Sequence, residues 1–584
     1  MPEYQNPQQE PGMEKRLLLV FALTFLLLLA VQPWLVKHFS KNAPAQQTQT
    51  QVQKPTAMPS APPAALAAPT GTAQAKSESE TVVENDLYRI TFTNKGGQVK
   101  SWILKNYKDD KGRPLELVNT IAAQKYGYPM SLWTYDEGLR AKLNSGLYVA
   151  SETGPQRAPT NLTFEYSDGD MVVRKTFHFD HSYVVKVNTS VAQKGQPVEA
   201  FLAWPAGFGD QTVPVSYAAS RIDTQLGDKT TRLEPKKVSG GASIGGPLNW
   251  AGVGDQYFAA VFLPDNPEAV RLITLHNEID IPKNLDKPDP NEMQKVPVLG
   301  AAAGNPSGVT SGRWFIGPKA VSVIDNIRST PLPGQSSAPN LGSLVDFGFF
   351  GIIAKPLFLW LKWTQQHWVS NWGWAIVILT VIINVALMPL RVSSMKSALK
   401  MQKVQPQIEA IKSRYKNLKM NDPKRNEMNQ EIAALFKQHK VNPAGGCFPL
   451  LIQMPFLFAF YTMLGAAIEL RHAPWFWIRD LSAPDPLHIM PILIIVSTLA
   501  MQMMTPTAGM DPTQRRMMNV MMPIMLGIFS WSVAAGLGLY WMLSTLISII
   551  QQWVMNRTEL GREMQAEQAK RARKKAGTVK AVRS

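Results

Sequence analysis

Four polar residues interrupt apolar segments in the C-terminal half of the sequence. Thr380 and Asn384 are four residues apart, and Arg391 follows seven residues later. On one helix these three would share a face, with Arg391 about 10 Å further along the axis. Gln453 lies in a second apolar segment. Because polar groups in lipid are costly and usually face a bundle interior or a wet cavity, these residues predict either a hydrophilic groove or hydrogen bonds between packed helices.

Two further patterns suggest catalysis or metal binding, and each fails on its context. Gly241, Ser243 and Gly245 match the nucleophile elbow, but glycines and a proline surround them where a strand and a helix are required. His178 and His181 are spaced so that they would lie near opposite faces of a strand, which disfavours a metal site. The phosphate loop G-x-x-x-x-G-K-S/T is absent from the sequence, so ATP hydrolysis of that type is not expected. We therefore expect a protein that is not an enzyme and has no cofactor or metal.

Composition excludes several classes of protein. The 584 residues are 45% hydrophobic and 18% charged, which provides a sizeable core and excludes disorder from end to end. Cys447 is the single cysteine, so a disulfide framework and a cysteine-based zinc cluster are excluded. The net charge of +17 suggests a nucleic acid partner, an anionic lipid partner or a basic tail, and the distribution of the charge must decide.

The N-terminal region contains an apolar run followed by a polar stretch. Leu17–Val36 would span about 30 Å as a helix, which matches one bilayer core. A cleaved signal peptide is the alternative, because Ala43-Pro44-Ala45 offers a cleavage site, but its apolar region would be only about 7 to 15 residues long. We expect an uncleaved transmembrane anchor over residues 1–40. Residues 41–80 are rich in Gln, Pro, Ala, Thr and Ser and predict a disordered tether.

Residues 81–335 consist of short apolar-polar alternations separated by turn signals. Tyr183–Asn188 alternates, Met171–Phe179 adds another strand, and Asn94–Gly97 indicates a turn. Many short strands without long amphipathic helices predict an antiparallel β-sandwich. About 250 residues is large but feasible for one all-β domain.

The sequence that follows this β region is typical of a membrane protein. Residues 342–366 are apolar but carry Lys355 and Lys362 on one helical face, which predicts an amphipathic helix in the membrane interface. Five spans form a predicted α-helical core over residues 370–555, because the last apolar stretch is about 57 Å long as one helix and must fold back near Ser532–Gly536. The predicted spans are Gly373–Leu390, Gly445–Ala467, Leu487–Met504 and the two halves of Met517–Val554. The N-terminal anchor makes a sixth span.

Positive charge is concentrated in two segments, residues 392–440 and residues 556–584. By the positive-inside rule both segments are cytoplasmic. The N-terminus is then cytoplasmic as well, and the β domain lies outside, which is compatible with a bacterial periplasm. We therefore expect a multi-pass protein of the bacterial inner membrane, with a large periplasmic domain and a basic cytoplasmic tail.

The first basic segment, 392–440, also has an apolar pattern. Apolar residues recur there at steps of four and three: Val404, Ile408 and Ile411, then Met428, Ile432 and Leu435. This pattern predicts a cytoplasmic helical hairpin closed along an apolar seam, with a basic outer face. Two interpretations stay open, a merely solvated hairpin and docking to an anionic partner such as ribosomal RNA or lipid headgroups.

One long motif, Asn442–Pro455, strongly resembles the bacterial YidC membrane-protein insertase family, which is related to the Oxa and Alb proteins. In the β region, Phe92–Gly97 and Phe315–Lys319 resemble the large periplasmic domain of that family. The resemblance covers nearly the whole chain and is weakest over residues 1–80 and 120–300. The long motif is specific, whereas each short one is weak by itself.

The resemblance implies a five-helix core with a hydrophilic groove that opens to the cytoplasm and the lipid. The family inserts and folds membrane proteins, alone or with the Sec translocon, and uses no bound nucleotide. The implied partners are nascent membrane proteins, the ribosome through the basic hairpin and tail, the Sec translocon and anionic lipids, with no role for DNA. The apolar segment of a substrate would slide along Met454, Leu457 and Trp541.

The sequence departs from the family at one groove position. The family usually carries an arginine in the groove, at the position that Asn384 occupies here. Arg391 could reach back toward the groove or point to lipid headgroups, because an arginine side chain extends over several ångströms.

Three rival functions make different demands on the sequence. A secondary transporter predicts internal repeats with discontinuous helices at matching positions, and no repeat relates the two halves. A scaffold anchored by its spans predicts that Asn384 and Gln453 are dispensable. A sugar-binding role of the outer domain would suit its strand-rich fold.

Overall fold

A computed structural model describes residues 72–210, 219–283, 288–415, 424–441, 448–504 and 516–559, with short pieces at 561–563, 565–566 and 569–570. The chain divides into two compact units. The described residues up to Asp346, together with Ala466–Ile468, form the β unit, and the remaining described residues from Phe347 onward form the helical unit. The anchor predicted over residues 1–40 and most of the tether predicted over 41–80 lie outside the described residues.

The β unit is built from three sheets whose strands come from distant parts of the sequence. The first has the order β4(Pro114–Glu116), β3(Gln98–Lys108), β2(Tyr88–Thr93), β1(Glu80–Glu84), β7(Gly154–Arg157). The second has the order β14(Lys229–Leu233), β13(Arg221–Leu226), β16(Trp250–Gly254), β17(Phe258–Pro264), β20(Val309–Pro318), β10(Val184–Gln193), β9(Met171–Phe179), β8(Thr160–Ser167), β6(Val149–Ala150), with β11(Gln196–Pro197) also paired to β10. The third has the order β15(Ser243–Gly245), β18(Arg271–Pro282), β19(Met293–Gly304), β12(Phe201–Trp204), β5(Ser131–Trp133).

The predicted antiparallel pairing is right for nearly all described strand pairs and wrong for one. β1 and β7 are parallel, with Thr81 opposite Gly154. A parallel pair needs a long connection, and two short helices and several strands lie between β1 and β7. The alternation of apolar and polar residues in the sequence corresponds to alternating burial: in β9 the odd-numbered positions from Met171 to Phe179 are buried, and the positions between them are partly or fully exposed. By contrast, every residue of β17 is buried, as expected for a strand covered on both faces.

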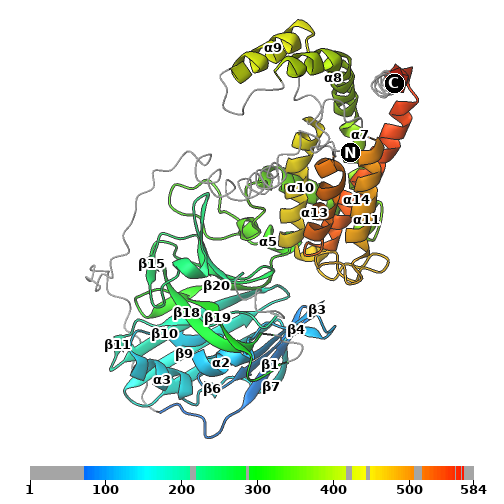
Figure 1. Cartoon of the computed structure of the whole chain (residues 1–584). Coiled ribbons are helices and arrows are strands. Elements are labelled where there is room, and N and C mark those ends of the chain that lie inside the picture. Colours follow the sequence, from blue (N-terminus) through cyan, green and yellow to red (C-terminus); the bar gives the residue numbers. More distant parts are fainter. Residues whose placement is uncertain are drawn as a thin grey trace. The chain divides into compact units, whose positions relative to one another are not determined.

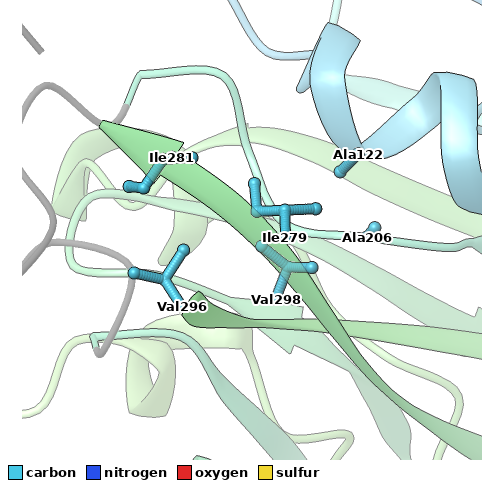
Figure 2. Packing of buried hydrophobic residues seen from close by; sticks show 6 residues of the cluster. All are labelled: Ala122, Ala206, Ile279, Ile281, Val296 and Val298. Carbon is cyan, nitrogen blue, oxygen red and sulfur yellow. The ribbon is translucent and has the colours of Figure 1, made fainter. Parts of the chain in front are cut away.

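Several short helices pack against the sheets of the β unit or connect their strands. α2(Thr120–Tyr126) begins at Asn119, whose side chain accepts a hydrogen bond from the Ala122 amide, and α3(Glu137–Ser145) begins at Asp136 in the same manner. Figure 2 shows how α2 lies against two strands: Ala122 from the helix faces an apolar cluster supplied largely by β18 and β19. The cluster consists of Ala122, Ala206, Ile279, Ile281, Val296 and Val298. The remaining short elements are η1(Pro235–Lys237), α5(Val321–Ile324) and η2(Leu341–Leu344).

The helical unit contains the apolar helices. In chain order the elements are α6(Gly351–His367), α7(Trp372–Ala386), α8(Met388–Arg414), α9(Lys424–Gln438), α10(Phe448–Ala466), η4(Ile468–Leu470), α11(Ile489–Met504), η5(Met517–Met521), α13(Met522–Ser530) and α14(Ala535–Asn556). α14 packs against α7 and α11, α11 packs against α13, and α6 packs against α7 (Figure 1). α8 and α9 continue beyond this bundle as a helical arm.

The last apolar stretch is broken where its length predicted a reversal. α13 ends at Ser530 and α14 begins at Ala535. Backbone amides of the first turn of α14 are hydrogen-bonded to the loop before α11: Ala535 donates to Ala483 at 2.7 Å and Gly536 donates to Leu481 at 2.9 Å. These bonds satisfy helix N–H groups that would otherwise lack partners and fix the point of the break.

Among the described residues, α14 alone is both long enough and apolar enough to cross a membrane as a single helix. α7 and α8 meet that condition together, with a 45° bend between them, and α11 is an apolar helix of shorter length. The number of six spans, and the five-helix core with its anchor, therefore stay predictions.

The predicted interfacial helix is α6, and it begins at Gly351 rather than at residue 342. Residues 342–346 belong to the β unit. Arg221 of β13 donates a hydrogen bond from Nη2 to the Leu344 carbonyl at 2.9 Å. Leu344 is the last residue of the short helix η2. Its hydrogen bond to Arg221 ties this segment to the β unit, so α6 begins only after it.

Candidate functional site

Thr380 and Asn384 lie on α7, and both side chains are fully buried. The Thr380 hydroxyl donates to the Ile376 carbonyl at 2.6 Å, and Asn384 Nδ2 donates to the Thr380 carbonyl at 2.9 Å. Both acceptors are four residues back on the same helix, a common way to satisfy polar side chains among apolar ones. These bonds are what the helix-packing interpretation of the sequence predicts for the two residues.

Asn384 also joins α7 to α14. Its Nδ2 lies 3.2 Å from Ser544 Oγ, and its main-chain carbonyl accepts a hydrogen bond from Gln551 Nε2 at 3.2 Å. Neither Ser544 nor Gln551 was among the predicted groove residues. A signal was available, because the two residues are seven apart in an apolar helix and therefore lie on one face.

Arg391 does not continue the helix that carries Asn384. α7 ends at Ala386 and α8 begins at Met388, because Pro389 has no amide hydrogen to continue the helical bonding across the junction. The expectation that Thr380, Asn384 and Arg391 share the face of one straight helix is therefore wrong. Nevertheless, Arg391 Nη2 reaches Asn384 Oδ1 at 3.4 Å, a long hydrogen bond. Of the two orientations left open by the sequence, the guanidinium takes the one toward Asn384.

Gln453 forms a second contact with α14. Its Nε2 donates to the Tyr540 hydroxyl at 3.1 Å, and Gln453 itself is partly exposed. Tyr540 is fully buried and stacks on Phe460, with ring centroids 4.1 Å apart. The sequence reasoning missed Tyr540, although a hydroxyl in an apolar helix needs a hydrogen-bond partner and could have marked it.

One face of α14 thus connects the predicted polar residues. Tyr540, the partner of Gln453, is one helical turn from Ser544, the partner of Asn384. Arg391 and Gln453 remain partly exposed, whereas Thr380 is sealed. We call this set the polar seam: Thr380, Asn384, Arg391, Gln453, Tyr540, Ser544 and Gln551. The polar seam offers amide, hydroxyl and guanidinium groups, which are suited to hydrogen bonding with a polypeptide. These seven residues include no pairing of a nucleophile with a general base.

The three residues predicted to guide an apolar segment are partly exposed. Met454 and Leu457 lie on α10 and Trp541 lies on α14. Met454 directly follows Gln453, and Trp541 directly follows Tyr540, so apolar side chains flank both members of the Gln453–Tyr540 hydrogen bond.

The residues of the nucleophile-elbow and histidine patterns lie on or next to strands of the β unit. Ser243 begins the short edge strand β15, which pairs with β18, and is not at a strand-to-helix elbow. His178 Nδ1 lies 2.6 Å from Asn161 Oδ1, and His181 follows in the turn after β9. Within the part of the chain that the structure describes, no group of three or more His, Cys, Asp or Glu residues could hold a metal ion.

The predicted seam of the basic hairpin is confirmed between α8 and α9. Val404 and Ile408 form a buried cluster with Val441, and Ile432 and Leu435 pack against it. At the far end, Arg414 forms an ion pair with Glu431 at 2.6 Å, and Tyr415 donates a hydrogen bond to the same carboxylate at 2.8 Å. At the near end, Val392, Met395 and Leu399 pack around Met555 of α14, so the hairpin is tied to the bundle.

The Ile408→Ala substitution is expected to loosen this hairpin. Ile408 is 5% exposed, and removal of a buried isoleucine side chain typically costs about 2–5 kcal/mol of stability. Hydrogen exchange of the α9 amides should accelerate accordingly. Lys412→Ala, an exposed change on the same helix, is the control and should leave the rates unchanged. Equal exchange in the two variants would show that the seam does not hold the hairpin.

Comparison with known proteins covers almost the full chain. Residues 80–361 match the family described as the YidC periplasmic domain, and residues 363–562 match the family described as 60Kd inner membrane protein. A protein of Syntrophus aciditrophicus named membrane protein insertase YidC is 31% identical over 93% of this chain and 100% of its own length. A Haemophilus influenzae protein of the same name is 32% identical over 93% of this chain and 97% of its own length.

This chain belongs to the YidC family. Among solved structures, an active YidC insertase with its first transmembrane domain resolved aligns with 83% of this chain and 95% of its own, at 19% identity and a TM-score of 0.33. YidC from Thermotoga maritima aligns with 82% of this chain and 98% of its own, at 15% identity and a TM-score of 0.27.

The two YidC family matches meet inside α6. The periplasmic-domain match ends at residue 361, whereas the β unit ends at Asp346 and α6 runs from Gly351 to His367. The family boundary therefore divides a continuous helix, and the structural boundary lies before it. The chain is a membrane protein of the YidC family, with a β-rich domain that is largely antiparallel.

Proposed function

We propose that this chain inserts and helps to fold integral membrane proteins in the bacterial inner membrane. The observation that carries the proposal is that 93% of the chain aligns with relatives that are themselves named membrane protein insertases. The polar seam supports it, because an insertase must accept polar groups inside an apolar bundle. No nucleotide hydrolysis is invoked, since the energy of transfer into lipid is sufficient.

The proposed path begins with the polar tail of a substrate. Burying one amide or hydroxyl without a partner costs roughly 2–7 kcal/mol, and hydrogen bonds to Arg391, Gln453 and Gln551 would offset part of that cost. The apolar segment then moves along Met454, Leu457 and Trp541 and leaves sideways into lipid. Strongly apolar residues contribute about −0.3 to −0.6 kcal/mol each at the centre of a span, so a segment of roughly 20 residues supplies the driving force.

The proposed topology places the basic segments on the cytoplasmic side. The hairpin of α8 and α9 and the tail over residues 556–584 would meet the ribosome or anionic lipid headgroups, because both partners carry phosphate charge. The β unit would be periplasmic, and the chain would work alone or with the Sec translocon. The hydrophilic groove would be the partly exposed side of the polar seam.

Insertion by the purified protein is the direct test of this function. The chain in liposomes receives a small single-span substrate with a short polar tail, without ATP and without the Sec translocon. Protection of the tail from protease above the level of empty liposomes is the expected result. Baseline protection, with a known insertase active in parallel, would contradict insertion by the chain alone and leave a chaperone or Sec-dependent role.

Arg391→Gln is expected to impair insertion selectively. The change removes the one cation in the polar seam but keeps a polar side chain with hydrogen-bonding groups at position 391. Since a hydrogen bond to a charged group contributes about 1.5–3 kcal/mol, insertion of a substrate with an acidic tail should fall about tenfold. A neutral tail should be inserted almost normally.

Two further variants control for the charge of Arg391. Arg391→Lys should retain most of the insertion of the acidic tail. Lys396→Gln removes an exposed charge from the same helix and should have little effect. If Arg391→Gln slows both substrates equally, Arg391 holds the bundle together rather than receiving the substrate.

A further inference from the structure

A tight turn between α10 and α11 holds an aromatic residue in an unusual backbone conformation. Trp475 and Ile478 exchange two backbone hydrogen bonds, at 2.8 and 2.9 Å, which close a turn with Phe476 and Trp477 at its corner. Phe476 has a φ of +49°, in the left-handed region that favours glycine or asparagine. A bulky side chain in this region indicates that the surrounding contacts hold the turn in this conformation.

The turn displays its aromatic rings at the surface. The Phe476 side chain is 73% exposed, and the neighbouring Trp374 of α7 is 46% exposed. The ring centroids of Trp374 and Phe476 are 6.0 Å apart, and those of Trp475 and Phe476 are 4.7 Å apart with the rings nearly perpendicular. We call Trp374, Trp475, Phe476 and Trp477 the aromatic tip.

Several contacts make the aromatic tip rigid. The Asn371 side chain caps α7 and also donates a hydrogen bond from Nδ2 to the Pro474 carbonyl at 2.7 Å. Trp475 lies against Gly373 so closely that a Cβ at Gly373 would be 2.2 Å from its ring. The exposure of Phe476 is therefore built into the fold of the turn.

The position of the tip indicates what covers it. The tip follows α10, precedes α11 and contacts the first turn of α7, so it lies where three apolar helices of the helical unit have their ends on one side. Arg479, which is exposed, comes directly after the turn. Aromatic rings beside a cationic side chain at the ends of membrane helices are typical of the boundary between headgroups and acyl chains.

We propose that the aromatic tip is a lipid-binding anchor seated in this boundary, with Phe476 toward the acyl chains and Arg479 toward the phospholipid phosphates. The proposal concerns how the protein is held in the bilayer. It shares with the proposed insertase function only the premise that α7, α10 and α11 cross the membrane. A nascent polypeptide covering the tip is the competing possibility, and the experiment separates the two.

Depth measurement on a spin label tests the anchor. Because Cys447 is the single cysteine, Cys447→Ser gives a background for labelling Phe476→Cys in the full-length protein. The protein is placed in vesicles of phosphatidylcholine and phosphatidylglycerol, and collisions with oxygen and with a water-soluble nickel chelate are compared. Labels at Val381→Cys, in the middle of α7, and at Tyr135→Cys, on the β unit, give the membrane and water references.

The expected result is strong loss of nickel accessibility at position 476 relative to position 135, without substrate present. Nickel accessibility equal to that at position 135 would overturn the anchor. Accessibility that is lost only when a nascent chain is added would also overturn it, and would assign the tip to substrate instead.

A second pair of variants separates anchoring from folding. Phe476→Gly removes the ring and suits the positive φ, so the turn itself is retained. A spin label at Pro474→Cys reports on the turn. Phe476→Gly should raise the nickel accessibility of this label, because the turn loses its contact with lipid. Leu487→Gly, which removes another exposed apolar side chain before α11, should leave the nickel accessibility of the label at position 474 unchanged. If Phe476→Gly leaves the nickel accessibility of the label at position 474 unchanged, the proposal is contradicted.

Discussion

Replacing Thr380, Asn384 and Gln453 together with leucine is expected to reduce insertion about tenfold or more while the protein remains folded. Insertion falls because the tail would lose the partly exposed Gln453 and because Arg391 would lose its partner Asn384, and a difference of about 1.4 kcal/mol already changes a rate tenfold. The Thr380 hydroxyl bonds only to its own helix, and leucine suits an apolar bundle. Loss of the Asn384–Ser544 and Gln453–Tyr540 hydrogen bonds is therefore expected to lower stability without unfolding the protein. Protease protection of the substrate tail measures insertion, and thermal unfolding in detergent measures stability.

Thr462→Leu is the matched control for the triple variant. Its hydroxyl, like that of Thr380, is hydrogen-bonded to carbonyls of its own helix, but it belongs to α10 and not to the polar seam. We expect nearly normal insertion from this variant. Normal insertion by the triple variant as well would refute a role of the polar seam in receiving substrates and favour the scaffold interpretation, in which these bonds only pack helices.

Lys175→Met is expected to destabilise the β unit by about 3 kcal/mol. The Lys175 ammonium is fully buried and donates hydrogen bonds to the carbonyls of Gly96 at 2.6 Å, Gly97 at 3.2 Å and Met130 at 2.8 Å. Methionine fills similar space but leaves these carbonyls without the donor, and each buried unpaired group costs about 1–3 kcal/mol. Urea unfolding of the full-length protein, followed by cleavage within the β unit, measures the loss. Lys186→Met, an exposed change on the adjacent strand, should shift stability by less than about 0.5 kcal/mol.

The same lysine predicts how stability depends on pH. Burial lowers the pKa of Lys175 from 10.5 to about 7, and burial together with Arg221 lowers the pKa of Lys319 to about 8. Between these values and 10.5, the unfolded chain binds protons that the folded chain does not bind. Stability of the β unit should therefore rise as pH rises from about 7 toward 10, by at most about 1.4 kcal/mol per pH unit for each lysine. Lys175→Met should show a shallower rise, and an unchanged slope would exclude Lys175 as its source.

Long-range contacts explain where the sequence reasoning succeeded and where it failed. Spacing at steps of three and four was sufficient for the hairpin seam, because Val404 and Ile408 are neighbours on one helix whatever else surrounds them. The same spacing gave a wrong prediction for Arg391, because α8 begins at Met388, beside Pro389, between Asn384 and Arg391. Tyr540 and Ser544 were missed because their partners, Gln453 and Asn384, are 87 and 160 residues away in sequence.

Local chemistry alone determined the division of this chain into a β region and an apolar helical region, the break before Ala535 and the basic hairpin, because each depends on residues close together in sequence. Only the tertiary structure decided that the predicted groove residues are joined through α14, that Thr380 and Asn384 are sealed while Arg391 and Gln453 keep an exposed side, and that β1 pairs in parallel with β7. The physical reason is that burial and hydrogen-bond pairing between distant segments depend on which elements pack together, and periodicity within one segment does not specify its partner.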